Sequence, residues 1–239
     1  MDMRATVCLP TYNEIENLER MVRMLGDVLP EGGRVLVIDD GSPDGTGELA
    51  DRLSGELPFV SVLHRTRKEG LGRAYIAGFH RALADDADLV LEMDCDFSHN
   101  PKDVPRLIAA TERADVAIGS RYVPGGGTEN WGLVRRLISR AGSLYTKTLL
   151  MPVNDPTSGF KCFRREVLER IDLDAIHSRG YAFQIENVYR ARRAGFRVVE
   201  IPITFVERET GHSKMSRAIV LEAIWKVPAL RLAALQGRL

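Results

Sequence analysis

The sequence contains little cysteine and no surplus of charge of either sign. Its 239 residues include three cysteines, Cys8, Cys95 and Cys162, which lie far apart and form no C-x-x-C pair. An odd, scattered set argues against a disulfide framework or a cysteine zinc site, and it favours a reducing compartment such as the cytoplasm. Lys plus Arg and Asp plus Glu both number 33. The chain therefore lacks the basic excess of a nucleic-acid-binding protein, and we expect no nucleic-acid partner.

Long hydrophobic runs and targeting segments are also missing. The first residues, M-D-M-R, include an acid and lead directly into a predicted strand, which is unlike a signal peptide. No run approaches the roughly 20 apolar residues of a membrane-spanning helix. The most apolar stretch, residues 218–235, is interrupted by Glu222, Lys226, Pro228 and Arg231. We expect it to form a terminal helix that either packs on the core or lies in a membrane interface, anchored by Trp225.

Two sequence fingerprints of nucleotide-binding proteins are absent as well. No G-x-G-x-x-G follows the first predicted strand, where P-T-Y-N-E stands instead, and no G-x-x-x-x-G-K-[ST] occurs. These absences argue against a dinucleotide-binding dehydrogenase and a P-loop protein. A receiver-like signalling module also gathers aspartates around Mg²⁺ at strand ends. We reject it because such a module would be much shorter and would not need the arginine-rich second half.

The apolar pattern predicts strands that alternate with helices. Strands are expected at residues 5–9, 35–38, 59–63, 89–93 and 115–118. Helices are expected at 14–29, at 71–84 and from Pro101, and a further helix should follow the second strand, with Ser42 as its N-cap. This order predicts an α/β fold, with a mostly parallel central sheet and helices on both faces. Beyond Ser120 we expect a helix at 133–149, mixed short elements, a helix at 183–194 and a strand at 197–205.

Two acidic clusters follow two of the predicted strands. They read D-D-G-S-P-D-G-T at residues 39–46 and M-D-C-D-F-S-H-N-P at residues 93–101. In parallel α/β sheets, ligands bind just beyond the carboxyl ends of the strands. Asp94 and Asp96 straddle Cys95, so both carboxylates can reach one hard cation such as Mg²⁺ or Mn²⁺, which often carries a diphosphate. The pattern points to a nucleotide-diphosphate ligand.

Basic residues gather in the stretch between residues 121 and 147. Glu129 is the only acid there, among Arg121, Arg135, Arg136, Arg140 and Lys147. Such a local excess of basic residues is either a solvated helix face or a binding site for anionic groups.

Taken together, these segments make the chain resemble the family-2 glycosyltransferases of the GT-A fold, and closely the polyprenyl-phosphate (dolichyl-phosphate) mannosyltransferases. The resemblance runs nearly end to end and adds further segments to those quoted above. These are G-S-R-Y at 119–122, R-x-x-x-S at 135–139, D-P-T-S-G-F at 155–160, F-Q-I-E at 183–186 and R-E-T-G-H-S-K at 208–214. Each segment alone is weakly specific, but their common order is a strong signal.

The resemblance implies one GT-A nucleotide-diphospho-sugar transferase domain over residues 1–239. It assigns a nucleotide-sugar half to residues 1–120, an acceptor half to 121–215 and a terminal amphipathic helix to 216–239. It implies an inverting enzyme that moves mannose from GDP-mannose to a polyprenyl (dolichyl) phosphate, with Mg²⁺ or Mn²⁺ as cofactor. Two alternatives stay open: a polyprenyl-phosphate glucosyltransferase that uses UDP-glucose, and transfer to a soluble glycan. A catalytically silent binding protein would be expected to have lost the acids or the arginines, which are all present.

Site residues follow from the same resemblance. The nucleotide-sugar site is expected to contain Pro10, Tyr12, Glu14, Ile38, Asp40, Asp94, Cys95, Arg121, Arg208 and Lys214. Asp94 and Asp96 would bind the metal, and Ser98 stands where similar enzymes often carry a glutamine ligand. The acceptor phosphate would be held by Arg121, Arg135 and Ser139, which together with Asp96 form the catalytic set. Asp39 is expected to be structural, and the roles of Asp155, at the sugar or in a turn, and of Glu186 stay open.

Access to a lipid acceptor implies contact with a membrane. We expect a peripheral protein on the cytoplasmic face, which docks through the helices at 133–149 and 218–235 or through a separate membrane-anchor protein.

Overall fold

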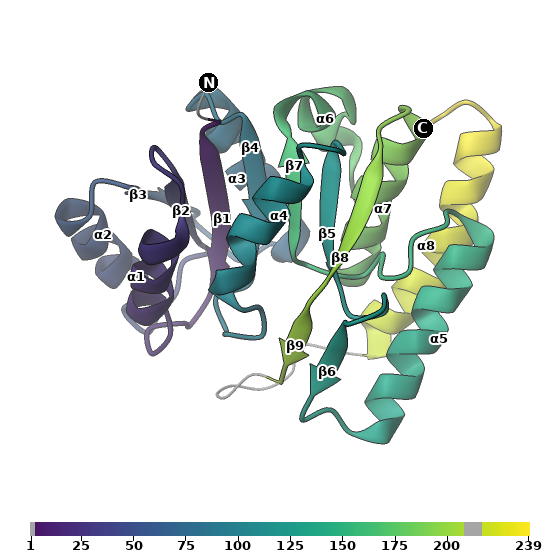
Figure 1. Ribbon diagram of the computed structural model, residues 1–239, viewed down its shortest axis with the longest axis horizontal. Helices are drawn as coiled ribbons and strands as arrows, with labels where there is room; N and C mark the ends of the chain where they lie inside the picture. The colour runs from purple at the N-terminus through teal and green to yellow at the C-terminus, as the bar shows by residue number, and fades with distance from the viewer. Residues whose placement is uncertain (1–2, 208–216) are drawn as a thin grey trace.

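The computed structural model describes residues 3–207 and 217–239. Its centre is a seven-stranded sheet with the strand order β3-β2-β1-β4-β7-β5-β8 (Figure 1). The strands are β1 (Ala5–Thr11), β2 (Arg34–Asp39), β3 (Val60–His64), β4 (Leu89–Glu92), β5 (Val116–Ser120), β7 (Lys161–Arg164) and β8 (Val198–Pro202). Every strand runs parallel except β7, which is antiparallel to both of its neighbours. A small second sheet pairs β6 (Gly127–Glu129) with β9 (Thr204–Val206).

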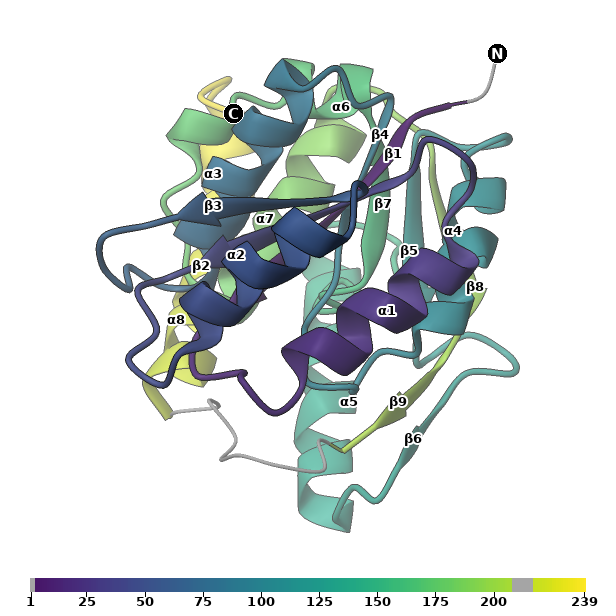
Figure 2. The same ribbon diagram turned by 90° about the vertical axis from the view of Figure 1, so that its left-hand side faces the viewer.

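Helices cover both faces of the large sheet (Figure 2). One face carries α1 (Leu18–Val28), α2 (Thr46–Glu56) and α4 (Val104–Ala110), which follows a 3₁₀ turn at Pro101–Asp103. The other face carries α3 (Leu71–Ala84), α6 (Arg165–Arg170) and α7 (Gly180–Arg193), with a second 3₁₀ turn at Leu173–Ala175. Two longer helices, α5 (Leu133–Leu149) and α8 (Arg217–Leu235), lie side by side at the end of the molecule.

Side-chain alternation along the strands fills both layers of the core. In β1, Val7 and Leu9 belong to the cluster under α1 and α2, whereas Cys8 belongs to the cluster under α3 and α7. Successive residues of a strand point to opposite faces, so a strand covered on both faces is apolar throughout. This arrangement explains the short continuous apolar runs of the sequence.

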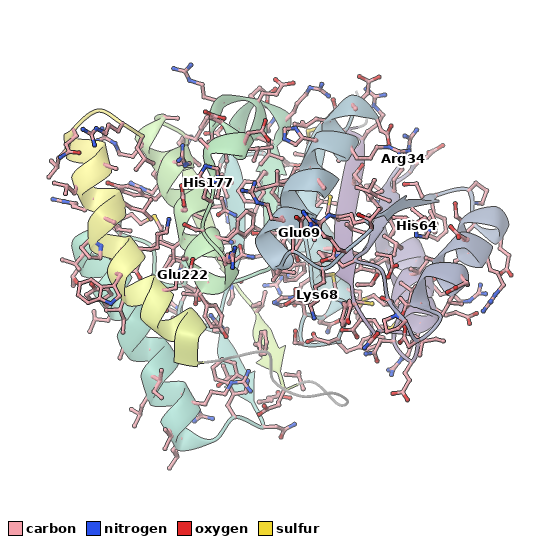
Figure 3. The ribbon with its side chains drawn as sticks, turned by 180° about the vertical axis from the view of Figure 1, so that it is seen from behind. Arg34, His64, Lys68, Glu69, His177 and Glu222 are labelled. Atoms are coloured by element: carbon pink, nitrogen blue, oxygen red, sulfur yellow. The ribbon has the colours of Figure 1, made fainter. Side chains whose placement is uncertain are left out.

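Helix α8 joins the body of the protein through its partly buried face. Val227, Leu230 and Ala234 are buried in the core cluster that contains α7. The Tyr145 hydroxyl of α5 donates to the Ile224 carbonyl at 3.0 Å. Figure 3 shows Glu222 on α8, whose Oε1 accepts from the backbone nitrogen of Arg179 at 3.0 Å. Within the described ranges, no helix combines the length and apolarity needed to cross a membrane.

The predicted α/β architecture is confirmed, and α3 and α5 have the predicted bounds. The predicted cap of α2 is wrong: its N-cap residue is Gly45, and the Ser42 hydroxyl instead donates to Asp39 at 2.5 Å. The strand predicted at residues 197–205 is two strands, β8 and β9, because each one pairs in a different sheet.

Candidate active site

The acidic and basic segments meet at one edge of the large sheet. β1, β2, β4 and β5 are parallel, so their carboxyl ends lie at the same edge. β7 runs in the opposite direction, and the segment before it, residues 155–160, therefore reaches the same edge. This edge is where parallel α/β proteins bind ligands.

The D-x-D segment forms a tight turn after β4. Asp96 is buried, and its Oδ1 accepts from the Ser98 amide at 3.1 Å. Asp94 is half-buried, and its Oδ1 accepts from the Tyr75 hydroxyl at 3.3 Å. Phe97, directly after Asp96, takes a left-handed φ of 58° within this turn.

His99 ends this turn and links it to the arginine side of the site. Its ring stacks on Phe160, with centroids 4.9 Å apart. The backbone nitrogen of Asp94 donates to its Nδ1 at 3.4 Å, which leaves the ring proton on Nε2. Burial lowers the pKa of His99 to about 4, with Asp96 opposing this shift and Arg121 reinforcing it. Asp96 and Arg121 therefore lie within electrostatic reach of the same buried imidazole.

The D-x-D turn carries two carboxylates, Asp94 and Asp96, and the hydroxyl of Ser98. Ser98 Oγ is buried and has no hydrogen-bond partner among the residues described, and such an atom calls for a further ligand or a bound water. No group of three or more His, Cys, Asp and Glu side chains in the described ranges could hold a metal. Mg²⁺ needs fewer, because one or two carboxylates usually bind it together with substrate phosphates and water. The residues present fit a Mg²⁺ or Mn²⁺ ion that a diphosphate helps to hold.

The P-T-Y-N-E turn follows β1 on the nucleotide side. The Lys68 ammonium lies 3.7 Å from the centroid of the Tyr12 ring. Figure 3 labels Lys68 and Glu69 on the segment between β3 and α3. Glu14 Oε2 accepts from the Asn17 side chain at 2.9 Å at the start of α1. An aromatic face and a carboxylate thus lie at the end of the first strand, as the predicted nucleoside contacts require.

The two aspartates after β2 have different partners. Asp39 accepts from the Ser42 amide at 3.2 Å and from the Thr11 hydroxyl at 3.4 Å, as expected for a structural residue. Asp40 forms an ion pair with Arg65, and both side chains are largely buried. Burial raises the pKa of Asp40, although Arg65 opposes this shift. A ribose or base hydrogen bond to Asp40 must therefore share the carboxylate with Arg65.

Three residues predicted for the nucleotide site contribute to the packing of the fold. The Ile38 side chain is fully buried against α3, where its Cδ1 would lie 2.3 Å from a Cβ placed on Gly78. Alternation along β2 turns this side chain into the core, and the place of Ile38 in the nucleotide-sugar site stays a prediction. Cys95 is buried in the opposite core cluster, which fits its expected packing role. Pro10 is half-buried in β1 and pairs in register with Ile38.

Arg121 is buried and held by Asp155. Its Nε donates to Asp155 Oδ2 at 2.7 Å, its Nη2 donates to Oδ1 at 2.6 Å, and its backbone nitrogen also donates to Oδ2 at 2.9 Å. Burial disfavours the charge of Arg121, but Asp155 outweighs it and raises the pKa of the guanidinium above its ordinary value. Asp155 thus orients the arginine. The Thr157 hydroxyl donates to Asp155 Oδ1 at 3.3 Å and accepts from Arg121 Nη2 at 2.9 Å.

The other two predicted phosphate ligands lie close to Arg121. The guanidinium groups of Arg135 and Arg121 lie 4.2 Å and 5.4 Å from the centroid of a Trp131 ring. Arg135 also forms an ion pair with Glu207. Ser139 Oγ accepts from the Tyr122 hydroxyl at 2.6 Å. The structure therefore brings the three residues of the predicted acceptor site together.

A cavity opens beside Ser139 between α5, α7 and α8. Arg135 and Ser139 line it together with Trp131, and its apolar walls include Ile138, Ile185 and Val227. A phosphate held by Arg135 and Ser139 would thus have an apolar channel next to it.

Sequence reasoning missed a buried polar cluster beneath the site. Lys161 Nζ donates to Glu92 Oε1 at 2.7 Å, and both side chains are fully buried. Gln184 also accepts from Lys161. Glu186, whose role was open, is buried in α7 and pairs with Arg190 at 2.8 Å. Only a sequence-based assignment of β7 could have revealed Lys161, and its segment carries no clear strand signal.

Two predicted donor-site residues cannot be placed. Arg208 and Lys214 lie outside the described residues.

The mostly parallel sheet, with helices on both faces and a D-x-D turn at the carboxyl end of β4, is the architecture of the GT-A glycosyltransferases. A family model described as "Glycosyl transferase family 2" matches residues 6–172. An undecaprenyl-phosphate mannosyltransferase of Micrococcus luteus is 52% identical over 233 residues, which cover 97% of this chain and 96% of the relative. A polyprenol monophosphomannose synthase of Mycolicibacterium smegmatis is 50% identical over 227 residues, which cover 94% of this chain and 85% of the relative. The chain belongs to glycosyl transferase family 2.

Solved structures agree on the fold. Glucosyl-3-phosphoglycerate synthase from Mycobacterium tuberculosis, solved with Mg²⁺ and uridine diphosphate, aligns with a TM-score of 0.70 at 20% identity. The alignment covers 96% of this chain and 79% of that chain. At this identity the likeness establishes the GT-A fold.

Proposed function

We propose that the protein transfers mannose from GDP-mannose to a polyprenyl phosphate, giving a polyprenyl-phosphate mannose with inversion at the anomeric carbon. The observation that carries the proposal is that the D-x-D turn after β4 and the Arg121–Asp155 pair after β5 lie at the same edge of the sheet, where His99 stacks on Phe160. The two relatives that are at least 50% identical are named for mannose transfer to a polyprenol or its phosphate. Residues 1–120 would bind the donor, and residues 121–215 would bind the acceptor.

The donor is proposed to lie across the ends of β1, β2 and β4. Tyr12 offers a ring face, and the carboxylates of Glu14 and Asp40 can accept from a base N–H group or ribose hydroxyls. Asp94 and Asp96 would hold a divalent cation, as the two carboxylates and the unsatisfied Ser98 hydroxyl allow. When bound, such an ion neutralises charge on the departing diphosphate. The fold neighbour from Mycobacterium tuberculosis was solved with Mg²⁺, which is consistent with this proposal.

The acceptor phosphate is proposed to bind between Arg121, Arg135 and Ser139. Arginine forks match phosphate oxygens, and the hydroxyl adds a donor. In the structure these groups already have protein partners, Asp155 for Arg121, Glu207 for Arg135 and Tyr122 for Ser139. Asp155 keeps the Arg121 guanidinium oriented, whereas the half-buried Arg135 and Ser139 can exchange their partners for a phosphate.

The chemistry follows from the charge of the acceptor. A phosphate oxygen is already an anion, so its attack on the anomeric carbon requires no strong general base. The residues of the protein then act by orienting the nucleophile and by placing positive charge where negative charge develops. One displacement turns an α-linked donor into a β-linked product.

A lipid acceptor is supported by the surface around α5 and α8. Large apolar side chains are more than half exposed there: Leu133, Val134, Leu137 and Leu144 on α5, and Trp225, Leu232 and Leu235 on α8. Concentrated exposed apolar area marks an interaction surface. We therefore propose that the two helices dock on a membrane, either alone or together with a separate membrane-anchor protein. The three buried free cysteines fit a location at the cytoplasmic face.

The test offers radiolabelled GDP-mannose and UDP-glucose, separately, to a short polyprenyl phosphate and to a soluble glycan. We expect a mannolipid from GDP-mannose only, and no lipid product with Asp96→Ala. A glucolipid would establish the glucosyltransferase alternative, and a labelled glycan would establish a soluble acceptor. Equal turnover by Asp96→Ala, with unchanged metal dependence, would contradict the metal assignment.

A further inference from the structure

The flank of α5 next to its exposed apolar face is basic. At about 100° per residue, Leu133, Leu137 and Leu144 lie on one face of the helix, and Arg136 and Arg140 lie on the neighbouring flank. All three leucines are at least 62% exposed. An interfacial helix has this distribution, with an apolar face bordered by Lys or Arg.

The two arginines also line a cavity. It has a volume of about 190 Å³, and its walls are formed by Arg121, Tyr122, Gly127, Thr128, Arg136 and Arg140. No acidic side chain lines it, as far as the described part of the chain extends. Neither Arg136 nor Arg140 forms an ion pair with a described residue, whereas Arg121 is paired with Asp155. The charge of the cavity is therefore positive and uncompensated on its α5 side.

This cavity shares Arg121 with the proposed acceptor-phosphate site but none of its other residues. Arg135 and Ser139 line the other cavity, which has apolar walls. Tyr122 lines the basic cavity, and its hydroxyl donates to Ser139 at 2.6 Å. Tyr122 therefore links the two cavities, of which the one beside Ser139 has the apolar walls.

We propose that the cavity formed by Arg136, Arg140 and Thr128 binds the phosphate of an anionic phospholipid headgroup in the membrane surface on which α5 lies. This inference rests on the membrane docking of the proposed function, and it adds a preference for anionic lipid. Charge complementarity supports a phosphate, since arginine is the side chain best matched to phosphate oxygens. The exposed leucines beside the cavity favour a lipid over a free phosphate, because the same helix face would reach the acyl chains.

The test compares binding to vesicles of phosphatidylcholine alone with binding to vesicles that also contain phosphatidylglycerol. The variant Arg136→Gln/Arg140→Gln is matched by Arg52→Gln/Arg113→Gln, which removes two exposed positive charges from elements on the α1–α2–α4 face. Each arginine near an anionic surface contributes roughly fivefold to binding. We expect the α5 variant to lose roughly 25-fold in affinity for the anionic vesicles and to keep its affinity for neutral ones, while the control variant retains both.

Two further measurements separate the possible occupants. The α5 variant should keep the wild-type kcat/KM for a short, water-soluble polyprenyl phosphate without vesicles. A fall in that value would assign the cavity to the acceptor and overturn the inference. Equal losses of affinity in both variants would show that binding depends only on net charge, and would contradict the inference. A phosphate salt that displaces the protein from anionic vesicles more than a chloride salt of equal ionic strength would assign the cavity to free phosphate. Because vesicle binding requires no sugar transfer, failure of the transferase proposal would be seen separately, in the radiolabel assay.

Discussion

Arg121 and Asp155 form an ion pair whose side chains are only 6% and 0% exposed. Replacing Asp155 by Asn would leave the guanidinium charged, buried and without a counter-charge. We expect a loss of about 3–5 kcal/mol in the free energy of unfolding, measured by urea denaturation. The matched control is Glu169→Gln, which breaks the i, i+4 pair with Arg165, where the side chains are 31% and 49% exposed. It should cost less than about 1 kcal/mol, and similar losses in both variants would contradict the importance of burial.

Asp96 provides a second prediction at the level of single residues. Replacing it by Asn removes one of the two proposed carboxylate ligands without changing the size of the side chain. Loss of a residue that only contacts a metal ligand typically lowers metal affinity by roughly 10- to 100-fold. Because Asp96 is proposed to bind the metal directly, we expect its replacement to lower Mn²⁺ affinity in the presence of GDP by more than this. Calorimetric titration of Mn²⁺ would measure this. Asp51→Asn, the same change on the exposed surface of α2, should leave the affinity unaltered.

The identity of the candidate residues could be predicted from sequence better than their partners. Asp94, Asp96 and Arg121 stand in short local segments, which the sequence displays directly. The partner of Arg121 is Asp155, 34 residues away, and it reaches the arginine only because β7 runs against its neighbours. Ile38 shows a related limit, since its segment predicts the end of a strand but does not reveal that its side chain packs against α3.

At the scale of elements, the packing of α3 on the sheet depends on a glycine. A Cβ at Gly78 would lie 2.3 Å from Ile38 Cδ1 and 3.3 Å from Cys8 Sγ. We expect Gly78→Ala to destabilise the protein by about 1–3 kcal/mol through overpacking, despite the better helix propensity of alanine. Gly55→Ala on α2 is the control, because no atom lies within 4 Å of its added Cβ. It should stabilise by about 0.5–1 kcal/mol, so thermal denaturation should show shifts of opposite sign.

The exposed faces of α5 and α8 lead to a second prediction at this scale. Leu137 is 68% exposed and Trp225 is 75% exposed, so Leu137→Ser and Trp225→Ser should change the unfolding free energy little. If these side chains enter a membrane, each change should weaken vesicle binding by roughly tenfold or more, measured by flotation. Ile15→Ser, at a residue 42% exposed near α1, should not affect flotation. Unchanged binding by both helix variants would exclude this surface as the docking face.

Helices were easier to predict than the later strands, for physical reasons. α3 and α5 are 14 and 17 residues long and show their periodicity over roughly four to five turns, so their bounds could be derived from the sequence alone. β7 has only four residues, and Lys161 and Arg164 replace the expected apolar side chains. Lys161 is buried there because Glu92 lies on the neighbouring strand, and such a long-range pairing leaves no local signal.

At the scale of the whole molecule, all three thiols belong to the core. Cys8, Cys95 and Cys162 are at most 2% exposed, and burial raises the pKa of Cys8 and Cys162 well above the ordinary thiol value. Because the thiolate is the reactive form, we expect iodoacetamide to label none of them in the native protein and all of them in denaturant. Mass spectrometry of timed samples would measure this. Rapid native labelling of Cys95 alone would show that the D-x-D turn opens without global unfolding.

The reversed strand β7 also affects how the protein is made. It is synthesised after β5 but lies between β4 and β5 in the sheet, so a nascent chain that ends before residue 161 has both strands without their native neighbour. Unpaired strand edges invite association with other chains. Ribosome-bound intermediates of this length should therefore depend on chaperones more than shorter ones that contain only β1 to β4, whose mutual pairing is complete by residue 92.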